Sequence, residues 1–372
     1  MKILANEFRK MFFYNNGWLI FIVLIVYQIT ALGFSNKTYN LQIEHYKSQY
    51  QIYLAEFGGE IDNKKTDALN IEEERIFRAE EKSLNLFRQL NDGEITVTEY
   101  DKELEKYEDI FEQKMAFTQL QSQYNYAEAN PEHRFVMYEN GWYIVMHESS
   151  PNYILTLCVI LLVIRCFCPE YETEMYGIIF CTKNGRINTF RAKILVSIIS
   201  IIICGFITAL MTLAAANIKF GLNSANHPIQ SLRFFSMCEY NITICQCFAL
   251  IWILKMLALC IIGMVTVLCC VLLNKSMPVF FVGGIINVLP YFIFDLKSIV
   301  QFVPHLGLSL SGYYFSGVEY ASPETGEYLT ETVPIYYLIA ACIVGIAILE
   351  ICLLISSNMW SKQRLKKAVR KA

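Results

Sequence analysis

Residues 246–273 read QCFALIWILKMLALCIIGMVTVLCCVLL, an apolar run that contains a single charged side chain, Lys255. A bilayer core about 30 Å thick is crossed by roughly 20 apolar residues in a helix, because lipid offers the backbone no hydrogen-bond partners. The run is long enough for that crossing and too apolar for the surface of a water-soluble domain. It therefore predicts a transmembrane helix.

Five further runs meet the same requirement. They are residues 17–34, 152–167, 194–216, 277–294 and 335–357. The composition agrees with this interpretation, since 55% of the 372 residues are hydrophobic and 17% are charged, against about 25% charged residues in soluble domains. The sequence therefore predicts an all-α membrane protein with six transmembrane helices.

Basic residues gather before the first run, between the second and third, in the short link before the fifth, and after the last. They are Lys2, Arg9, Lys10, Arg165, Lys183, Arg186, Arg191, Lys193 and Lys275, together with Lys362, Arg364, Lys366, Lys367, Arg370 and Lys371 in the tail 358–372. Cytoplasmic segments of membrane proteins are enriched in lysine and arginine. We therefore expect a multi-pass protein of the cell membrane with both termini in the cytoplasm and residues 35–151 outside.

The first 16 residues are amphipathic. Leu4, Phe8 and Met11 share one helical face, whereas Arg9 and Lys10 lie on another. This pattern is typical of a helix that lies in the membrane interface. A cleaved signal peptide ending near residue 33 is the alternative, although the apolar run is longer than a typical signal core.

Residues 35–151 form an acidic segment, with 23 of the 34 acidic and 12 of the 31 basic residues. Three apolar stripes at helical spacing predict a helical hairpin or small bundle. The stripes are Ile43-Tyr46-Tyr50-Tyr53-Phe57, Ile76-Ala79-Ser83-Leu86-Leu90 and Tyr100-Leu104-Tyr107-Phe111. Thr98 and Asp101 have the spacing of a capping box, which predicts the start of the third helix. The acidic face is either simply solvated or attracts cationic ligands.

Motifs of independent catalysis are missing from the sequence. It contains no GxxxxGK[ST] phosphate-binding loop, no HExxH and no GxSxG, which are the patterns of nucleotide, zinc-protease and serine-hydrolase sites. Its five histidines have no metal-ligand spacing. We therefore expect neither an enzyme nor a bound cofactor or metal, and any energy for transport must come from another subunit.

The link between the second and third spans, residues 168–193, places carboxylates next to a glycine. It reads PEYETEMYGII over residues 169–179, and Arg186 and Lys193 follow. Glutamates can pair with basic side chains of a soluble partner, and Gly177 permits a close approach or a sharp bend. The alternative is an ordinary loop whose charges only fix the topology.

This layout resembles the ABC-2 type permeases, the membrane subunits of bacterial ATP-driven exporters. The resemblance covers the interfacial helix, the outer segment, the six spans and the glutamate-rich link, although residues 182–185 read TKNG where many relatives have a threonine-proline pair. It implies a coupling helix that docks on a cytoplasmic ABC ATPase, and a homodimer or a heterodimer with a related permease. The candidate coupling residues are Glu170, Glu172, Glu174, Gly177, Arg186 and Lys193.

Three ionisable residues fall within the predicted spans, where charges are costly and usually face protein or water. Arg165 and Glu350 lie at similar predicted depth, so we hypothesise that they pair, with snorkelling of Arg165 to the headgroups as the alternative. Lys255 lies deeper and either lines a cavity or finds a partner.

The sequence thus predicts a permease that couples ATP hydrolysis by a separate subunit to the export of an unidentified cargo, amphipathic or peptide in nature. Lipid and the ATPase are the expected partners, and nothing points to nucleic acid. Two alternatives remain open. One is a membrane-anchored receptor or immunity module for antimicrobial peptides, and the other is a scaffold subunit without transport.

Overall fold

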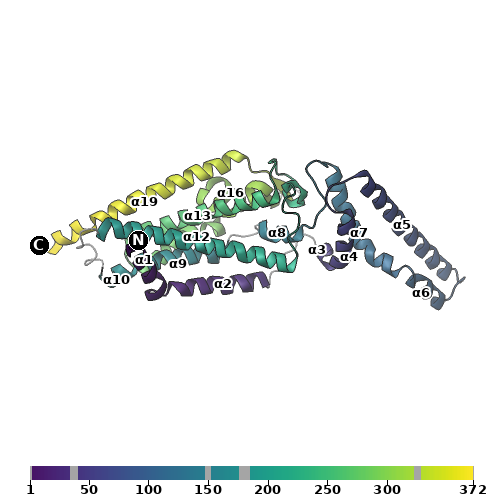
Figure 1. Cartoon of the computed structure of the whole chain (residues 1–372), viewed down its shortest axis with the longest axis horizontal. Helices are drawn as coiled ribbons and strands as arrows, with labels where there is room; N and C mark the ends of the chain where they lie inside the picture. Colours follow the sequence, from purple (N-terminus) through teal and green to yellow (C-terminus); the bar gives the residue numbers. More distant parts are fainter. Residues whose placement is uncertain (1, 34–40, 147–151, 176–184, 322–327, 372) are drawn as a thin grey trace. The chain divides into compact units, whose positions relative to one another are not determined.

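The computed structural model describes residues 2–33, 41–146, 152–175, 185–321 and 328–371. About 80% of the chain is helical, which confirms the predominantly helical class. The chain divides into two compact units, and Figure 1 labels many of their helices. Unit 1 comprises Met1–Ser35, Val145–Ile218 and Phe248–Ala372, and unit 2 comprises Asn36–Ile144 and Lys219–Cys247.

Unit 1 consists mainly of helices, most of them apolar, that range from 4 to 37 residues in length. They are α1 (Lys2–Arg9), the π-helix η1 (Lys10–Tyr14), α2 (Gly17–Gly33), α9 (Tyr153–Phe167), α10 (Pro169–Glu172), α12 (Gly185–Lys219), α13 (Ile244–Leu273), α14 (Ser276–Asn287), α15 (Pro290–Ile293) and α19 (Ile335–Lys371). Four short helices precede the last one: α16 (Leu296–Phe302), α17 (Pro304–Gly307), η4 (Leu308–Leu310) and α18 (Tyr313–Ser316).

Among the described residues, four helical segments are long and apolar enough to cross a membrane. They are Ile187–Lys219, Ile244–Leu273, Ser276–Ile293 and Ile335–Trp360. A fifth results if Ile3–Tyr14 and Gly17–Ala31, which meet at 63°, are counted as one bent span. Helix α9, with 15 residues, is about 22 Å long and falls short of a bilayer core. The structure thus supports a membrane protein, but its helix lengths do not establish all six predicted spans.

Helix α9 forms the centre of the unit 1 core. Its buried side chains pack with those of α2, α12, α13 and α14. Gly283 of α14 allows close contact here, because a Cβ at this position would lie 3.4 Å from the Ile160 side chain. Helix α9 is therefore held by protein on several sides.

One antiparallel β-hairpin departs from the predicted all-α class. Strands β1 (Val318–Ala321) and β2 (Tyr328–Glu331) pair with Val318 opposite Glu331 and Ala321 opposite Tyr328. Gly317, with φ of 80°, precedes β1, and this left-handed conformation suits glycine. The segment is too short and too polar to give a period-2 signal that stands out from a loop.

Unit 2 is a small helical bundle. Its helices are α3 (Leu41–His45), α4 (Lys47–Phe57), α5 (Asn63–Asn91), α6 (Val97–Glu105) and α7 (Glu108–Glu128), with the short turns η2 (Ile229–Ser231) and η3 (Arg233–Phe235), while α8 (Asn140–Met146) leads into unit 1. Tyr50 and Phe57 of α4 are buried against Phe117 and Leu120 of α7. Helix α5 returns through a turn into α6 and α7, which makes the helical hairpin seen in Figure 1.

The predicted capping box lies two residues too late. Thr96, not Thr98, begins α6: its hydroxyl accepts from the Glu99 N–H at 3.3 Å, and its own N–H donates to the Glu99 carboxylate at 2.9 Å. The longer glutamate side chain reaches back to the cap, as this motif requires, whereas Asp101 is shorter. The chain also breaks at Lys106 between α6 and α7, where the sequence predicted one helix.

Residues 219–247 belong to unit 2, although the sequence analysis confined the outer domain to residues 35–151. Ile229, Leu232 and Phe235 are fully buried, and the Tyr126 hydroxyl donates to the Gln230 carbonyl at 2.8 Å. Arg233 forms an ion pair with Glu139, whose side chain is 1% exposed, at 3.0 Å. Such contacts join segments that are about a hundred residues apart, which local periodicity cannot indicate.

Protonation of His227 is expected to destabilise unit 2. Its ring packs edge-on against Phe135 at 4.9 Å, its Nδ1 has no hydrogen-bond partner, and burial lowers the pKa of His227 although Glu60 opposes the shift. The folded state therefore binds this proton less readily than the unfolded state, so stability falls as the pH drops through the ordinary histidine value of about 6.5. We expect the calorimetric Tm to fall less between about pH 7.5 and 5.5 in His227→Gln than in the wild type. Identical shifts in both proteins would contradict this assignment.

Candidate functional site

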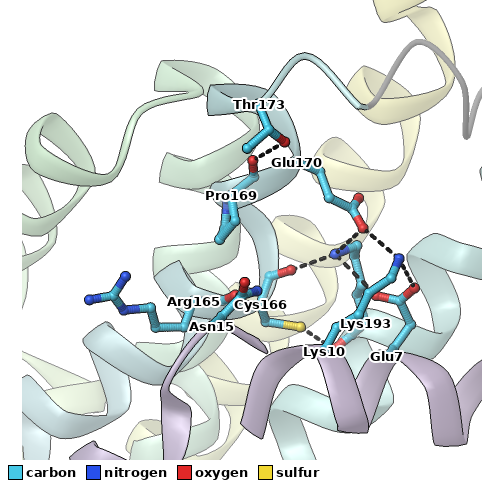
Figure 2. Close-up of polar contacts among 9 residues, drawn as sticks. All are labelled: Glu7, Lys10, Asn15, Arg165, Cys166, Pro169, Glu170, Thr173 and Lys193. Atoms are coloured by element: carbon cyan, nitrogen blue, oxygen red, sulfur yellow. Dashed lines mark hydrogen bonds and ion pairs between the residues drawn. The ribbon is translucent and has the colours of Figure 1, made fainter. Parts of the chain in front are cut away.

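Two of the predicted coupling residues, Glu170 and Lys193, lie together in unit 1 with two residues of the N-terminal helix, Glu7 and Lys10 (Figure 2). We call these four residues the four-charge cluster. They come from α1 and η1, which are consecutive, and from α10 and α12, whose members of the cluster follow 160 residues or more later in the sequence. The cluster therefore joins the N-terminal amphipathic segment to the segment that the sequence analysis singled out for coupling.

Lys193 is the centre of the four-charge cluster. Its Nζ lies 3.2 Å from Glu7 Oε2 and 3.2 Å from Glu170 Oε1, and it donates to the Cys166 carbonyl. Lys10 Nζ lies 3.1 Å from Glu7 Oε1 and 3.2 Å from Glu170 Oε1. The exposed fractions of the side chains are 2% for Lys193, 6% for Glu7, 11% for Glu170 and 44% for Lys10. Three of the four charges are thus withdrawn from solvent.

The local sequence explains why these side chains meet. Pro169 stands at the first position of α10 directly after the end of α9, and proline is well suited to that position. On the other side, the π-helix η1 ends at Tyr14 and is capped by Asn15, and Asn16, with φ of 55°, then bends the chain before α2. Gly17 is required at the bend, because a Cβ there would lie 2.6 Å from the Met11 carbonyl. The Asn15 side chain then donates to the Arg165 carbonyl at 2.9 Å.

The charges of the four-charge cluster balance, with two carboxylates and two ammonium groups. A buried charge that loses its partner is costly, whereas a balanced and hydrogen-bonded set is tolerated. Glu170 Oε2, however, is buried without a hydrogen-bond partner. Glu170 is also one of the residues that line a cavity of about 190 Å³, together with Thr173 and Met175.

The other predicted coupling residues have separate positions. Glu172 accepts from the backbone N–H of Ser276 at 2.7 Å and so caps the start of α14, where a negative charge is favourable. Glu174 is exposed and has φ of 59°. Gly177 lies outside the described residues, and so does the side chain of Arg186, which belongs to α12.

The three predicted intramembrane charges do not meet. Arg165 is exposed and its guanidinium points away from the four-charge cluster (Figure 2). Glu350 is exposed as well, and among the described ion pairs none joins it to Arg165. Lys255 is half-buried, and its Nζ lies 4.7 Å from the centre of the Trp252 ring, a cation–π distance.

The sequence analysis missed Glu7 and Trp360. Trp360 of α19 is buried, and its ring lies 5.5 to 6.1 Å from the rings of Phe167, Tyr171 and Phe190. Glu7 carries a usable signal, because it is the one acidic residue in the first 16 and shares a helical face with the apolar Leu4 and Met11. An acid on an apolar face predicts a buried partner. Trp360 gives no comparable local signal.

The arrangement is suited to transmitting movement between elements. It links α1, α10 and α12 by ion pairs, α14 by the Glu172 cap and α19 by Trp360. In the part of the chain that the structure describes, no group of three or more His, Cys, Asp or Glu side chains could hold a metal ion. Comparisons of the chain with family models, with curated proteins and with solved structures give no match.

Proposed function

We propose that the chain is the membrane-spanning permease subunit of an ATP-driven exporter in the cell membrane. A separate cytoplasmic ABC ATPase supplies the energy, and the cargo is amphipathic or a peptide. The observation that carries the proposal is the four-charge cluster, because it fixes the N-terminal helix and the Glu170 segment to the start of the long apolar helix α12. A displacement of this segment would be transmitted to several apolar helices at once.

The proposed topology has six spans, with α2 and α9 added to the four long apolar helices. The short α9 continues almost directly into α10, so that residues 153–172 together approach the required length. Both termini lie in the cytoplasm because the segments next to them are basic. Unit 2, whose part between residues 36 and 144 is strongly acidic, lies outside. The working assembly is a homodimer, or a heterodimer with a related permease.

The glutamates of the coupling segment have two different roles. Glu170 and Glu172 hold the segment to unit 1, since the first is buried in the cluster and the second caps α14. Glu174 and Met175 are exposed and are the residues that we propose to contact the ATPase. A carboxylate beside an apolar side chain fits a groove with a basic rim on the partner.

The test is reconstitution in liposomes with a candidate cytoplasmic ABC ATPase. We expect Glu174→Lys to uncouple hydrolysis from transport, with a loss of about tenfold or more in permease-stimulated ATPase activity, because a reversed charge repels the basic rim. Glu174→Gln should have a smaller effect. Glu73→Lys, a charge reversal at an exposed residue of unit 2, is the matched control and should leave coupling intact. Full transport by Glu174→Lys would refute the assigned contact.

A further inference from the structure

Unit 2 contains a groove of about 770 Å³ at the break between α6 and α7. Its floor is apolar and consists of Tyr46, which precedes α4, with Leu104 of α6 and Phe111 of α7. These three side chains are half-buried, so each still offers surface to a ligand. The volume lies in the range of sites that take small molecules or short peptide segments.

Four carboxylates form the rim of this groove. They are Asp101, Glu105, Glu108 and Glu112, all exposed. Lys102 is the one basic residue among the groove's lining residues. In the part of the chain that the structure describes, none of the four carboxylates forms an ion pair, whereas α5 nearby neutralises Glu74 with Arg78 at 2.8 Å.

The spacing of these carboxylates brings like charges together on both helices. Asp101 and Glu105 are four residues apart on α6, and Glu108 and Glu112 are four residues apart on α7. Like charges at this spacing destabilise a helix, while opposite charges stabilise it. Both helices thus carry like charges four residues apart at the same groove, and no ion pair among the described residues compensates them. Such unfavourable local arrangements are typical of ligand-binding surfaces.

The chemistry of the groove restricts that ligand. A metal ion does not fit the arrangement, because no described group of three or more acidic, His or Cys side chains could hold one. A small polycation would leave the apolar floor unused. A peptide with basic residues on one face and aliphatic or aromatic residues on the other would satisfy both parts, since its cations can also lie over the Tyr46 and Phe111 rings.

We propose that this groove binds a cationic, amphipathic peptide segment, with the basic side chains on the carboxylate rim and the apolar side chains on the Tyr46–Leu104–Phe111 floor. The inference stands independently of ATP-driven export, because the binding requires only unit 2 and neither the ATPase nor the four-charge cluster. It assigns a ligand class to the acidic surface.

The test uses the full chain in lipid nanodiscs made of uncharged lipid, without ATPase or nucleotide. The probe is a fluorescently labelled amphipathic peptide of lysine, leucine and tryptophan, and the readout is its fluorescence anisotropy. We expect saturable binding that weakens as salt is added, and no binding of the same peptide with glutamate in place of lysine. Absence of saturable binding to the wild type would overturn the proposal.

Variants separate the groove from the general field of an acidic unit. We expect Glu105→Lys with Glu108→Lys to weaken binding about tenfold or more, and Phe111→Ala to weaken it while leaving its salt dependence unchanged. Glu105→Lys gains an opposite charge four residues from Asp101, whereas Glu108→Lys places a positive charge in the first turn of α7, where it is unfavourable. The two effects oppose each other, so the thermal stability of this double variant should stay close to that of the wild type.

The matched control is Glu73→Lys with Glu81→Lys, which reverses two exposed carboxylates of α5 outside the groove. It changes the net charge by the same amount and should retain wild-type binding within about twofold. Equal loss in the groove variant and in this control would show attraction by the overall charge only and would overturn the site. Loss confined to the groove variants supports it.

Discussion

Replacing Lys193 by methionine is expected to destabilise unit 1 by about 3–5 kcal/mol, the cost of leaving a buried charge without its partner. Lys193 is 2% exposed and contacts both Glu7 and Glu170. In its absence, the half-exposed Lys10 alone faces two buried carboxylates. Denaturant unfolding of the full chain in detergent measures the loss of unfolding free energy. In hydrogen exchange, the exchange rate should increase most for the amides of α1 and α10.

The same helix provides the control for this prediction. Arg191 lies two residues away on α12 but is exposed, so Arg191→Met removes the same charge and should cost less than about 1 kcal/mol. Adding Glu170→Gln to Lys193→Met should recover part of the stability, because Lys10 then faces one buried carboxylate instead of two. Equal costs at positions 191 and 193 would show that the four-charge cluster contributes nothing specific.

The sequence predicted those features that depend on local composition. Apolar length and basic flanks identify α12, α13 and α19 as candidate spans, because burial in lipid demands continuous apolarity. The 3-4 spacing of Tyr50, Tyr53 and Phe57 predicted the buried face of α4 for the same kind of reason. Each of these signals lies within one element and needs no knowledge of its neighbours.

The candidate site was predicted only in part, because it is made by distant segments. Glu170 and Lys193 attracted attention as charges near the membrane, but their shared contact with Glu7 depends on how the N-terminal helix bends at Asn16. The sequence suggested that the three glutamates of the coupling segment act alike. In the structure, Glu170 is buried and Glu174 is exposed. This difference depends on tertiary packing alone.

The ion pair of unit 2 was not predicted either, because its two partners are also distant in the sequence. A second prediction with a large effect follows from this pair. Arg233 comes from the segment between α12 and α13, and its side chain and backbone N–H both donate to the Glu139 carboxylate. Arg233→Met should therefore lower the free energy of opening of unit 2 by about 3–5 kcal/mol. Hydrogen exchange of the α7 amides in the full chain measures this change.

The pH dependence distinguishes a stranded carboxylate from a mere loss of packing. Burial already raises the pKa of Glu139, and Arg233 opposes that rise, so its removal should raise the pKa further. A folded-state pKa above the unfolded value favours the fold when the group is protonated, and that stability is lost as the pH rises through the folded pKa. Arg233→Met should thus be less impaired at about pH 5 than at about pH 7.5. Arg233→Met with Glu139→Gln provides the reference, since it has no carboxyl to titrate and should recover most of the stability. The stability of Arg233→Met is compared with that of the double variant at both pH values. If the difference is the same at about pH 5 and about pH 7.5, the loss of stability comes from packing and not from an unpaired buried charge.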